Sequence, residues 1–142
     1  MTPAGAAAVH ASCVAHGDRG LLILGPSGSG KSALALRLMA LGAVLVADDQ
    51  TLLTREGDTL IARCPPQLRG LIEARFVGLL RAPAQDSVRV ALVVDLSHQE
   101  SARLPPHRNV TLLDVTLDLV LASESNHFPA AVLCYLAHGR AA

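Results

Sequence analysis

Glycine, lysine and serine recur in one short stretch whose spacing suits the binding of phosphate. The stretch has the pattern G-x-x-x-x-G-K-S, follows an apolar run at 21–24 and precedes an Ala- and Leu-rich helical pattern. Glycines let the backbone bend so that its N–H groups face an anion, and the helix N-terminus adds partial positive charge. The complete pattern in this context predicts a P-loop. Its phosphate-binding residues would be Gly25, Pro26, Ser27, Gly28, Ser29, Gly30, Lys31 and Ser32.

Within this loop two side chains have distinct chemistry. Lys31 would reach the outer phosphates, and the Ser32 hydroxyl would contact a Mg²⁺ ion. Phosphoryl transfer also needs an acidic residue at the end of an apolar strand, to hold the metal or to accept a proton. The pair Asp48-Asp49 follows the apolar run at 43–47, and Asp95 lies near the end of the run at 88–96.

The adjacent carboxylates of Asp48 and Asp49 are the stronger candidates for this role. Two neighbouring carboxylates repel each other unless a metal or a proton lies between them, which a purely structural pair would avoid. Asp95 is the alternative. Charge alone does not separate Asp48 from Asp49.

One histidine lies close in sequence to this group. His10 is on an apolar strand predicted to neighbour the P-loop strand, where a histidine on its own more often is a buried, hydrogen-bonded side chain. The other histidines considered lie in polar loops or near the terminus, and no two of them have the H-x-x-x-H spacing of a metal site. These are His98, His107, His127 and His138.

The elements that must position these residues alternate between strand and helix. We expect an α/β fold with a P-loop kinase-type core, a mixed sheet with flanking helices and a β-hairpin. A strand-helix-strand unit would place the aspartates at the carboxyl edge of the sheet beside the loop. The expected strands are 9–15, 21–24, 43–47, the hairpin 51–55 with 59–64, 88–96, and one or two over 110–121; the expected helices are 31–41 and 128–138.

Three further segments are expected to be less regular. The stretch 68–80 has glycines and charges of both signs and suits a strand or loop that touches a ligand. A polar loop is predicted over 97–109, and residues 123–126 offer N-capping side chains for the last helix.

Composition narrows the class of protein. The chain has 142 residues, enough for one domain over 1–142, and its 51% hydrophobic but 2% aromatic content predicts a core of Ala, Leu and Val. Twelve basic and twelve acidic residues balance, which argues against nucleic-acid binding. Three scattered cysteines suggest small core residues of a reducing compartment. No leader or membrane span is recognisable, so we expect a soluble cytoplasmic protein without a membrane partner.

Four stretches together resemble the C-terminal catalytic domain of the HPr kinase/phosphorylase family. They cover roughly the first half of the chain in the family's order and spacing, while the second half matches loosely. The chain is similar in length to the short, single-domain form found in some bacteria. The stretches are Val9-His10, the P-loop, Val46-Ala47-Asp48-Asp49, and Leu71-Ile72-Glu73-Ala74-Arg75-Phe76-Val77-Gly78.

The resemblance implies a bacterial enzyme of the sugar phosphotransferase system, using ATP and Mg²⁺ to phosphorylate a serine of the phosphocarrier HPr. It also implies the reverse phosphorolysis with inorganic phosphate, which gives pyrophosphate, and a homo-oligomer, a hexamer by family analogy. The implied roles are a base from the Asp48-Asp49 pair, usually the second aspartate; Mg²⁺ binding by Ser32 and Glu73; assistance at the phosphoryl group by His10 and Lys31; and a catalytic arginine, Arg103.

Departures from the family pattern leave alternatives open. Ala33 stands where Glu is common, Phe76 and Ala11 where Gly is common, and the region of Arg103 is shortened. The ring of Phe76 would change how closely its loop approaches the substrate. The alternatives are a nucleotide-binding sensor without transfer activity and a P-loop kinase of a small metabolite.

Overall fold

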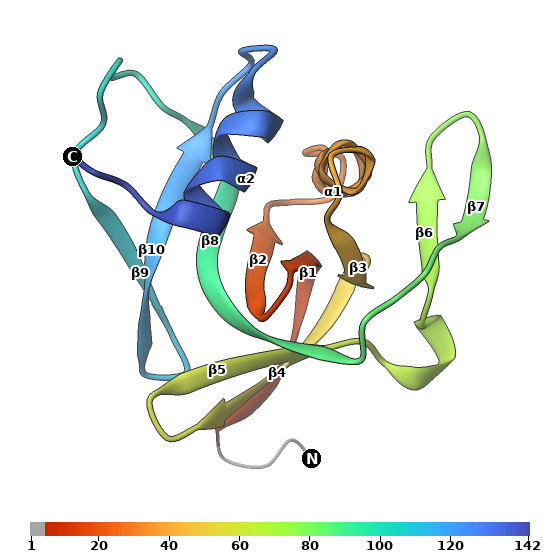
Figure 1. Cartoon of the computed structure of the whole chain (residues 1–142). Helices are drawn as coiled ribbons and strands as arrows, with labels where there is room; N and C mark the ends of the chain where they lie inside the picture. The colour runs from red at the N-terminus through yellow and green to blue at the C-terminus, as the bar shows by residue number, and fades with distance from the viewer. Residues whose placement is uncertain (1–4) are drawn as a thin grey trace.

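A mixed β-sheet with two helices on one side forms the framework of the chain (Figure 1). The computed structural model describes residues 5–142. The strands are β1 (Ala6–His16), β2 (Arg19–Leu24), β3 (Val44–Ala47), β4 (Gln50–Glu56), β5 (Thr59–Arg63), β6 (Leu71–Ala74), β7 (Gly78–Arg81), β8 (Ser87–Gln99), β9 (Arg108–Leu112) and β10 (Val115–Ala122). The helices are α1 (Lys31–Ala40), the 3-10 turn η1 (Pro66–Leu68) and α2 (Phe128–His138).

The strand pairings close on themselves. β1 pairs with β2 along its second half, and its other edge pairs first with β4 and then with β3. β4 pairs with β5, β5 with the start of β8, and β8 with β2, so β2, β1, β4, β5 and β8 form a closed path. The remaining strands β10 and β9 extend the sheet from the far end of β8. Closure leaves the P-loop strand β2 paired along both edges.

The expected fold class is confirmed, with one difference at the centre of the sheet. β2 and β3 do run in the same direction around α1, but β1 lies antiparallel between them. The P-loop strand therefore has β1 and β8 as neighbours instead of β3. Because β2 and β3 still end at the same edge, Asp48 and Asp49 lie on the side of the sheet where the phosphate loop begins.

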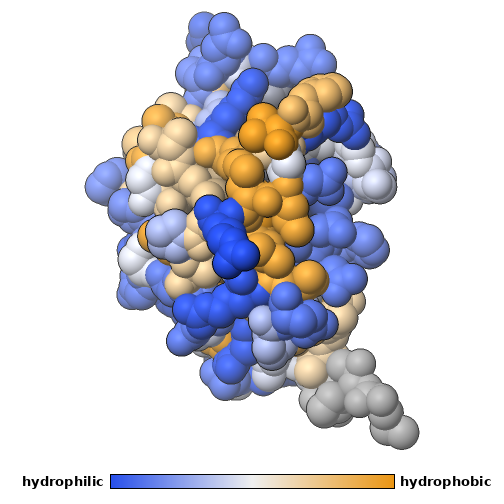
Figure 2. All heavy atoms as spheres, turned by 90° about the vertical axis from the view of Figure 1, so that its right-hand side faces the viewer, coloured by the Kyte–Doolittle hydropathy of each residue, from blue (hydrophilic) through white to orange (hydrophobic). Residues whose placement is uncertain are grey.

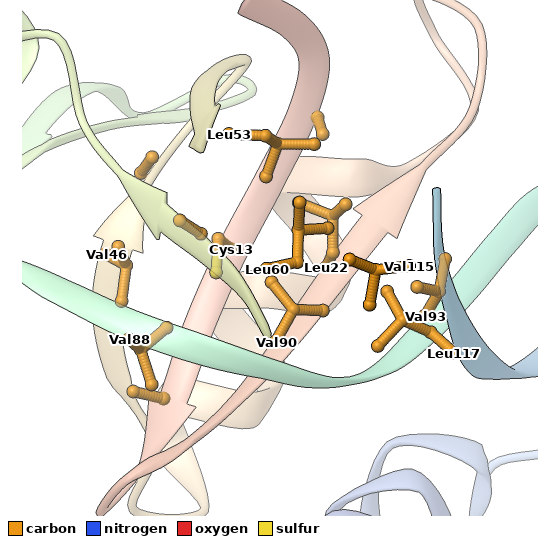
Figure 3. Packing of buried hydrophobic residues seen from close by; sticks show 14 residues of the cluster. Cys13, Leu22, Val46, Leu53, Leu60, Val88, Val90, Val93, Val115 and Leu117 are labelled. Atoms are coloured by element: carbon orange, nitrogen blue, oxygen red, sulfur yellow. The ribbon is translucent and has the colours of Figure 1, made fainter. Parts of the chain in front are cut away.

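Alternation along the strands divides the buried side chains into two cores. One core fills the inside of the closed path and contains Cys13, Leu22, Leu60 and Val93 (Figure 3). The other lies between the sheet and the two helices. It includes Val14, Leu21, Ile23, Leu38, Leu92, Val132 and Leu136. Successive residues of β1 and β2 thus point to opposite cores, as period-two alternation requires.

Most element boundaries agree with the sequence expectation. The helix 31–41 is found as α1, and Gly42 adopts φ 109°, a conformation that favours glycine and ends the helix. The hairpin of β4 and β5 and the helix α2 with Pro129 in its first turn are confirmed. The segment 68–80 forms the small hairpin of β6 and β7, a separate two-stranded sheet.

Other expectations were wrong in detail. No side chain caps the N-terminus of α2, whose N-cap residue is His127, so the predicted caps in 123–126 are not used. β8 continues to Gln99, which shortens the polar loop, because its far half finds a partner in β10. Of the cysteines only Cys13 is buried; Cys134 is exposed. Within residues 5–142, no helix has both the length and the apolar composition needed to cross a membrane.

Candidate active site

The loop between β2 and α1 has a backbone conformation that leaves N–H groups without partners at the N-terminus of α1. Gly28 and Gly30 have φ values of 82° and 99°, in the left-handed region where a side chain is disfavoured. A side chain at position 25 would collide with Ser29. The first intrahelical bond of α1 runs from Leu34 N to Gly30 O at 2.9 Å, and no side chain caps this end. The preceding N–H groups of the helix therefore remain available to an anion.

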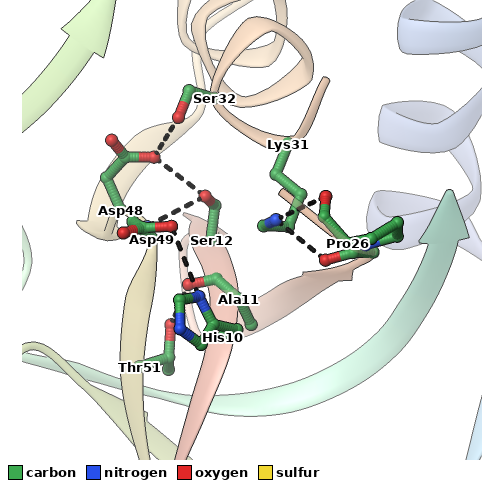
Figure 4. Close-up of polar contacts among 10 residues, drawn as sticks. His10, Ala11, Ser12, Pro26, Lys31, Ser32, Asp48, Asp49 and Thr51 are labelled. Atoms are coloured by element: carbon green, nitrogen blue, oxygen red, sulfur yellow. Dashed lines mark hydrogen bonds and ion pairs between the residues drawn. The ribbon is translucent and has the colours of Figure 1, made fainter. Parts of the chain in front are cut away.

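Lys31 is fixed against the loop that it follows. Its side chain is buried, and Nζ donates to the carbonyl oxygens of Gly25 at 2.8 Å and Pro26 at 3.1 Å (Figure 4). An ammonium group has three N–H donors, so one remains for a ligand in the loop. A buried cation beside free helix N–H groups forms a concentrated positive site that matches phosphate.

Asp48 is a buried carboxylate that three groups hold in place. Oδ1 accepts hydrogen bonds from Ser12 Oγ at 2.8 Å and Ser32 Oγ at 2.6 Å, and Oδ2 accepts one from Glu73 N at 3.0 Å. This single side chain joins β1, the start of α1 and the strand β6. Because the Ser32 hydroxyl donates its hydrogen bond to Asp48, the lone pairs of its oxygen remain free for a cation.

Asp49 has a different environment from its neighbour. Its backbone φ is 64°, and its side chain is 63% exposed, with Oδ1 lying 3.6 Å from His10 Nδ1 (Figure 4). The backbone N–H of Asp49 donates to Ser12 Oγ at 3.2 Å, and its carbonyl oxygen accepts from Ala11 N at 3.1 Å. The left-handed turn thus directs the two carboxylates apart: Asp48 toward the serines, Asp49 toward His10 and solvent.

Sequence reasoning missed Ser12, which links both aspartates. It is fully buried, donates to Asp48 and accepts from the Asp49 backbone. The available signal was a hydroxyl inside an otherwise apolar strand, since a buried hydroxyl needs a partner. His10, which a strand position alone would bury, is instead 74% exposed in its side chain.

A cleft of about 480 Å³ brings most of the predicted residues together. Its walls come from the phosphate loop, the first turns of α1, Asp49 and the hairpin of β6 and β7. The lining residues that concern the site are Ser27, Lys31, Ser32, Asp49, Glu73 and Arg75. The predicted phosphate loop and an exposed carboxylate thus line the same cleft, an arrangement suited to proton removal next to a phosphoryl group.

Arg103 and Asp95 are not among the residues that line this cleft. His10 and Asp48 do not line it either, but they contact its lining residues Asp49 and Ser32. Arg103 lines another pocket of about 300 Å³, formed with the loop 100–106, β10 and α2. Asp95, the alternative acidic residue, lies within β8 instead of at its end, and its Oδ1 accepts from the backbone N of Ser97 at 2.9 Å. The structure therefore does not bring Arg103 or Asp95 to the lining of the loop cleft.

Oxygen donors at the cleft suit a hard divalent cation. Ser32 Oγ and the carboxylates of Asp48 and Glu73 are the donor type that Mg²⁺ prefers, and this ion keeps several waters and takes few protein ligands. In the described part of the chain no cluster of three or more His, Cys, Asp or Glu side chains forms an all-protein metal cage. The donor set therefore fits Mg²⁺ shared with a phosphate ligand.

Comparison with known proteins gives matches in one family. The family model for the HPr Serine kinase C-terminal domain matches residues 2–111. The chain is 48% identical over 82 residues to an HPr kinase/phosphorylase from Chromobacterium violaceum, covering 53% of this chain and 26% of that protein. A relative of the same name from Cupriavidus necator is 41% identical over 97 residues, covering 61% and 30%. The chain thus spans about a quarter to a third of the length of these relatives.

A solved structure supports the fold. The structure described as the Hpr(Ser) kinase/phosphatase from Coxiella burnetii superposes with a TM-score of 0.74, covering 89% of this chain and 91% of that one. The two sequences are 24% identical in this comparison. This similarity extends past the end of the matched family region and includes most of the closed sheet.

Proposed function

The chain belongs to the HPr serine kinase C-terminal domain family, and from this premise we propose that it transfers the γ-phosphoryl group of ATP to a serine of an HPr-like phosphocarrier. The observation that carries the proposal is the cleft in which Asp49, paired with His10, faces the phosphate loop. A phosphate site alone would fit any nucleotide-binding protein. An exposed carboxylate across the same cleft adds the group that an attacking hydroxyl needs.

Donor binding would use the loop and Lys31. The backbone N–H groups at the start of α1 and the remaining N–H of Lys31 Nζ would bind the β- and γ-phosphates. Ser32 and Glu73 would hold Mg²⁺, which when bound neutralises charge on the phosphates. Asp48 would act through Ser32: by accepting a hydrogen bond from the hydroxyl, it leaves the lone pairs of the serine oxygen available to a cation. These groups position the donor before the reaction and so lower the entropic cost of transfer.

Proton transfer would use Asp49. The carboxylate of Asp49 takes the proton of the acceptor serine while the serine oxygen forms a bond to the γ-phosphorus. The bond between that phosphorus and the bridging oxygen breaks, and its electron pair leaves on the β-phosphate of ADP. His10, 3.6 Å from Asp49 Oδ1, orients the carboxylate.

We also propose the reverse reaction with inorganic phosphate. An oxygen of inorganic phosphate attacks the seryl phosphate, the bond from phosphorus to the serine oxygen breaks, and pyrophosphate forms. Asp49, carrying a proton taken up from solvent, gives it to the departing serine oxygen, so its role is opposite to that in phosphorylation. Arg103 lines the separate pocket beside α2, so we assign it no step in this proposal.

One assay tests the proposal against its alternatives. The full chain is incubated with γ-labelled ATP, Mg²⁺ and a panel of purified HPr proteins, and labelled phosphoserine is measured. We expect label on a serine, and release of pyrophosphate when inorganic phosphate is added to the isolated product. Nucleotide binding without labelled serine would contradict the kinase and indicate a sensor.

The matched control for this assay is Lys31→Ala. Loss of the buried ammonium should weaken ATP binding by about tenfold or more, because charge-assisted hydrogen bonds to phosphate are lost. Wild-type binding and transfer in this variant would contradict the assignment of the loop itself. Calorimetric titration with ATP measures the first quantity without depending on an acceptor.

A further inference from the structure

The turn that joins β6 to β7 presents an aromatic side chain in an unusual backbone conformation. Phe76 has φ 71° and is 98% exposed. The turn is closed by a hydrogen bond from Val77 N to Ala74 O at 3.0 Å. A bulky residue at positive φ is strained, and glycine is the residue that fits such a position without cost.

Packing within the chain does not compensate for this strain. Among residues 5–142, four residues other than glycine have positive φ: Asp49, Phe76, Leu113 and Asp114. Leu113 and Asp114 form the two-residue turn between β9 and β10, where a hairpin favours positive φ. Asp49 lies in the candidate site. Phe76 gains no burial in return, which points to a role outside the folding of the monomer.

The place of Phe76 in the fold connects it to the cleft. Its two chain neighbours, Arg75 and Val77, line the cleft together with the phosphate loop and Asp49. The strand β6 that leads into this turn is fixed to the rest of the chain. Ile72 is buried in the core under the helices, and Glu73 N donates a hydrogen bond to Asp48. The ring therefore projects from a braced hairpin at the rim of the proposed transfer site.

The exposed apolar surface at this rim is small. Besides Phe76, Val77 is 75% exposed and Leu79 is 67% exposed. Figure 2 shows hydrophobic surface on the face that carries β6 and β7. An aromatic side chain buries about 150–250 Å², so the tip alone supplies much less than the roughly 800 Å² per partner of a stable interface. A contact of this size suits a substrate that must dissociate after each turnover.

We infer that Phe76, with Val77, is the contact that selects the protein acceptor by packing against an apolar patch beside the acceptor serine. The inference rests on the proposed function and adds its specificity element. The partner is a folded protein whose serine must reach Asp49, so its surface next to that serine meets the tip of the hairpin. Phe76 acts in binding; it does not touch the donor loop and takes no part in proton transfer.

The test compares Phe76→Asn with Phe76→Tyr in the full chain. Asn tolerates positive φ and removes the ring, while Tyr keeps the aromatic surface. With purified HPr as acceptor and saturating ATP and Mg²⁺, Phe76→Asn should raise KM for the acceptor by about five- to thirtyfold. The kcat and the Kd for ATP should stay within about twofold of the wild-type values, and Phe76→Tyr should have the wild-type KM.

A matched control is Leu104→Asn, the same kind of change at an exposed apolar side chain in the loop of the other pocket. It should leave KM, kcat and the Kd for ATP unchanged. Thermal unfolding of each variant checks folding, and Phe76→Asn should unfold at or above the wild-type temperature because it loses no packing.

The outcomes separate the inference from the function beneath it. If the wild type transfers phosphate and Phe76→Asn has the wild-type KM, the inference is wrong and the kinase stands. If sedimentation shows that Phe76→Asn abolishes an oligomer while KM is unchanged, the tip binds a second copy, which also overturns the inference. If the wild type neither phosphorylates nor binds HPr with a non-hydrolysable ATP analogue, the proposed function fails and takes the inference with it.

Discussion

At the scale of single residues, one left-handed backbone position assigns different tasks to two adjacent aspartates. Asp48 is buried and accepts three hydrogen bonds, from Ser12, Ser32 and the Glu73 backbone. Asp49 has φ 64° and an exposed carboxylate beside His10. The oxygens of Asp48 are engaged in this buried network, whereas the carboxylate of Asp49 is open to a ligand in the cleft. This difference in exposure is consistent with the proposal that Asp49 is the base and Asp48 a positioning residue.

Asp49→Asn should separate proton transfer from folding. We expect kcat for serine phosphorylation to fall by about 10²–10⁴-fold because the general base is lost. The free energy of unfolding should change by less than about 0.5 kcal/mol, since the side chain is exposed. Steady-state kinetics and urea unfolding measure the two quantities. Activity close to wild type would remove Asp49 from the mechanism.

Asp48→Asn should have the opposite balance. The amide would turn N–H donors toward a site that already holds three donors, so unfolding free energy should drop by about 1–3 kcal/mol. Urea unfolding measures this loss, and ATP titration with and without Mg²⁺ should show a smaller effect of the metal, because Ser32 is no longer held. A variant as stable as the wild type would contradict the buried network.

At the scale of elements, β8 changes which face it buries partway along its length. Val88 and Val90 point into the closed sheet, and so does Val93, whereas Leu92 and Val94 face the helices. Period-two alternation would not put both Val90 and Val93 on one face. Gly20 of β2 lies opposite Val90 and the next residue, Leu21, lies opposite Leu92, so Ala91 is an extra residue in β8. An extra residue in one strand reverses the faces to which the following side chains point, which puts Val93 on the same side as Val90. The same strand can then pair with β5 at its start and β10 at its end.

An ion pair ties the end of β8 to the start of β9. Arg108 Nε and Nη2 donate to Glu100 Oε1 and Oε2 at 2.9 and 3.0 Å. The hydrogen bond from Arg108 lowers the pKa of Glu100, and the backbone N–H groups of Ala102 and Ser101 act in the same direction. This bidentate contact joins the two ends of the loop 100–107, so the guanidinium of Arg108 holds this loop in place.

Glu100→Gln should change how stability depends on pH. Because the pKa of Glu100 is lower in the folded state, its contribution to stability is complete above the unfolded value of about 4.3 and is lost as pH falls through the folded pKa. The variant should melt below the wild type at pH 7, and the difference should vanish in acid. Melting temperatures across a pH series measure this.

The control for this prediction is Glu56→Gln, at an exposed glutamate of the hairpin between β4 and β5. It should follow the wild-type melting curve more closely at every pH. Arg108→Gln should reproduce the Glu100→Gln profile, since either change removes the same pair. A melting difference for Glu100→Gln that is constant across the pH series would contradict the link to ionisation.

At the scale of the whole molecule, the closed sheet joins two cores that share their strands. β1, β2 and β8 send alternate side chains inside the closed path and toward α1 and α2. If one core unfolds, these strands lose their order, and the other core loses the side chains that they contribute to it. The phosphate loop emerges from β2, which pairs with β1 on one edge and β8 on the other, so the loop is anchored on a strand without a free edge.

This sharing predicts one cooperative unfolding transition. Leu60→Ala in the inner core and Leu38→Ala under the helices remove fully buried side chains, and each should cost about 2–5 kcal/mol. Tyr135, the single tyrosine of a chain without tryptophan, lies in α2 and reports on the helical side. In urea, its fluorescence and the far-ultraviolet circular dichroism should change together in both variants. Separate transitions in Leu60→Ala would show that the cores unfold independently.

Much of the fold followed from local patterns in the sequence. Apolar alternation and turn residues predicted β1, β2, the hairpin of β4 and β5, and the helices α1 and α2, because each depends on neighbours a few residues away. The insertion of β1 between β2 and β3, and the closure of β2 on β8, were not predicted. Both depend on pairings between distant segments, which no local period encodes.

The site divides in the same way. By itself, the sequence determined the strand-turn-helix that carries Gly25 to Ser32 and the strand that precedes the acidic pair, because fixed spacing in this context dictates where N–H groups and Lys31 must lie. Only the tertiary structure gave Asp48 and Asp49 different surroundings, brought in Ser12, exposed His10 and put Arg103 in another pocket. The physical reason is that burial and hydrogen-bond partners arise where β1, β3, α1 and β6 meet, and those contacts join residues far apart in the chain.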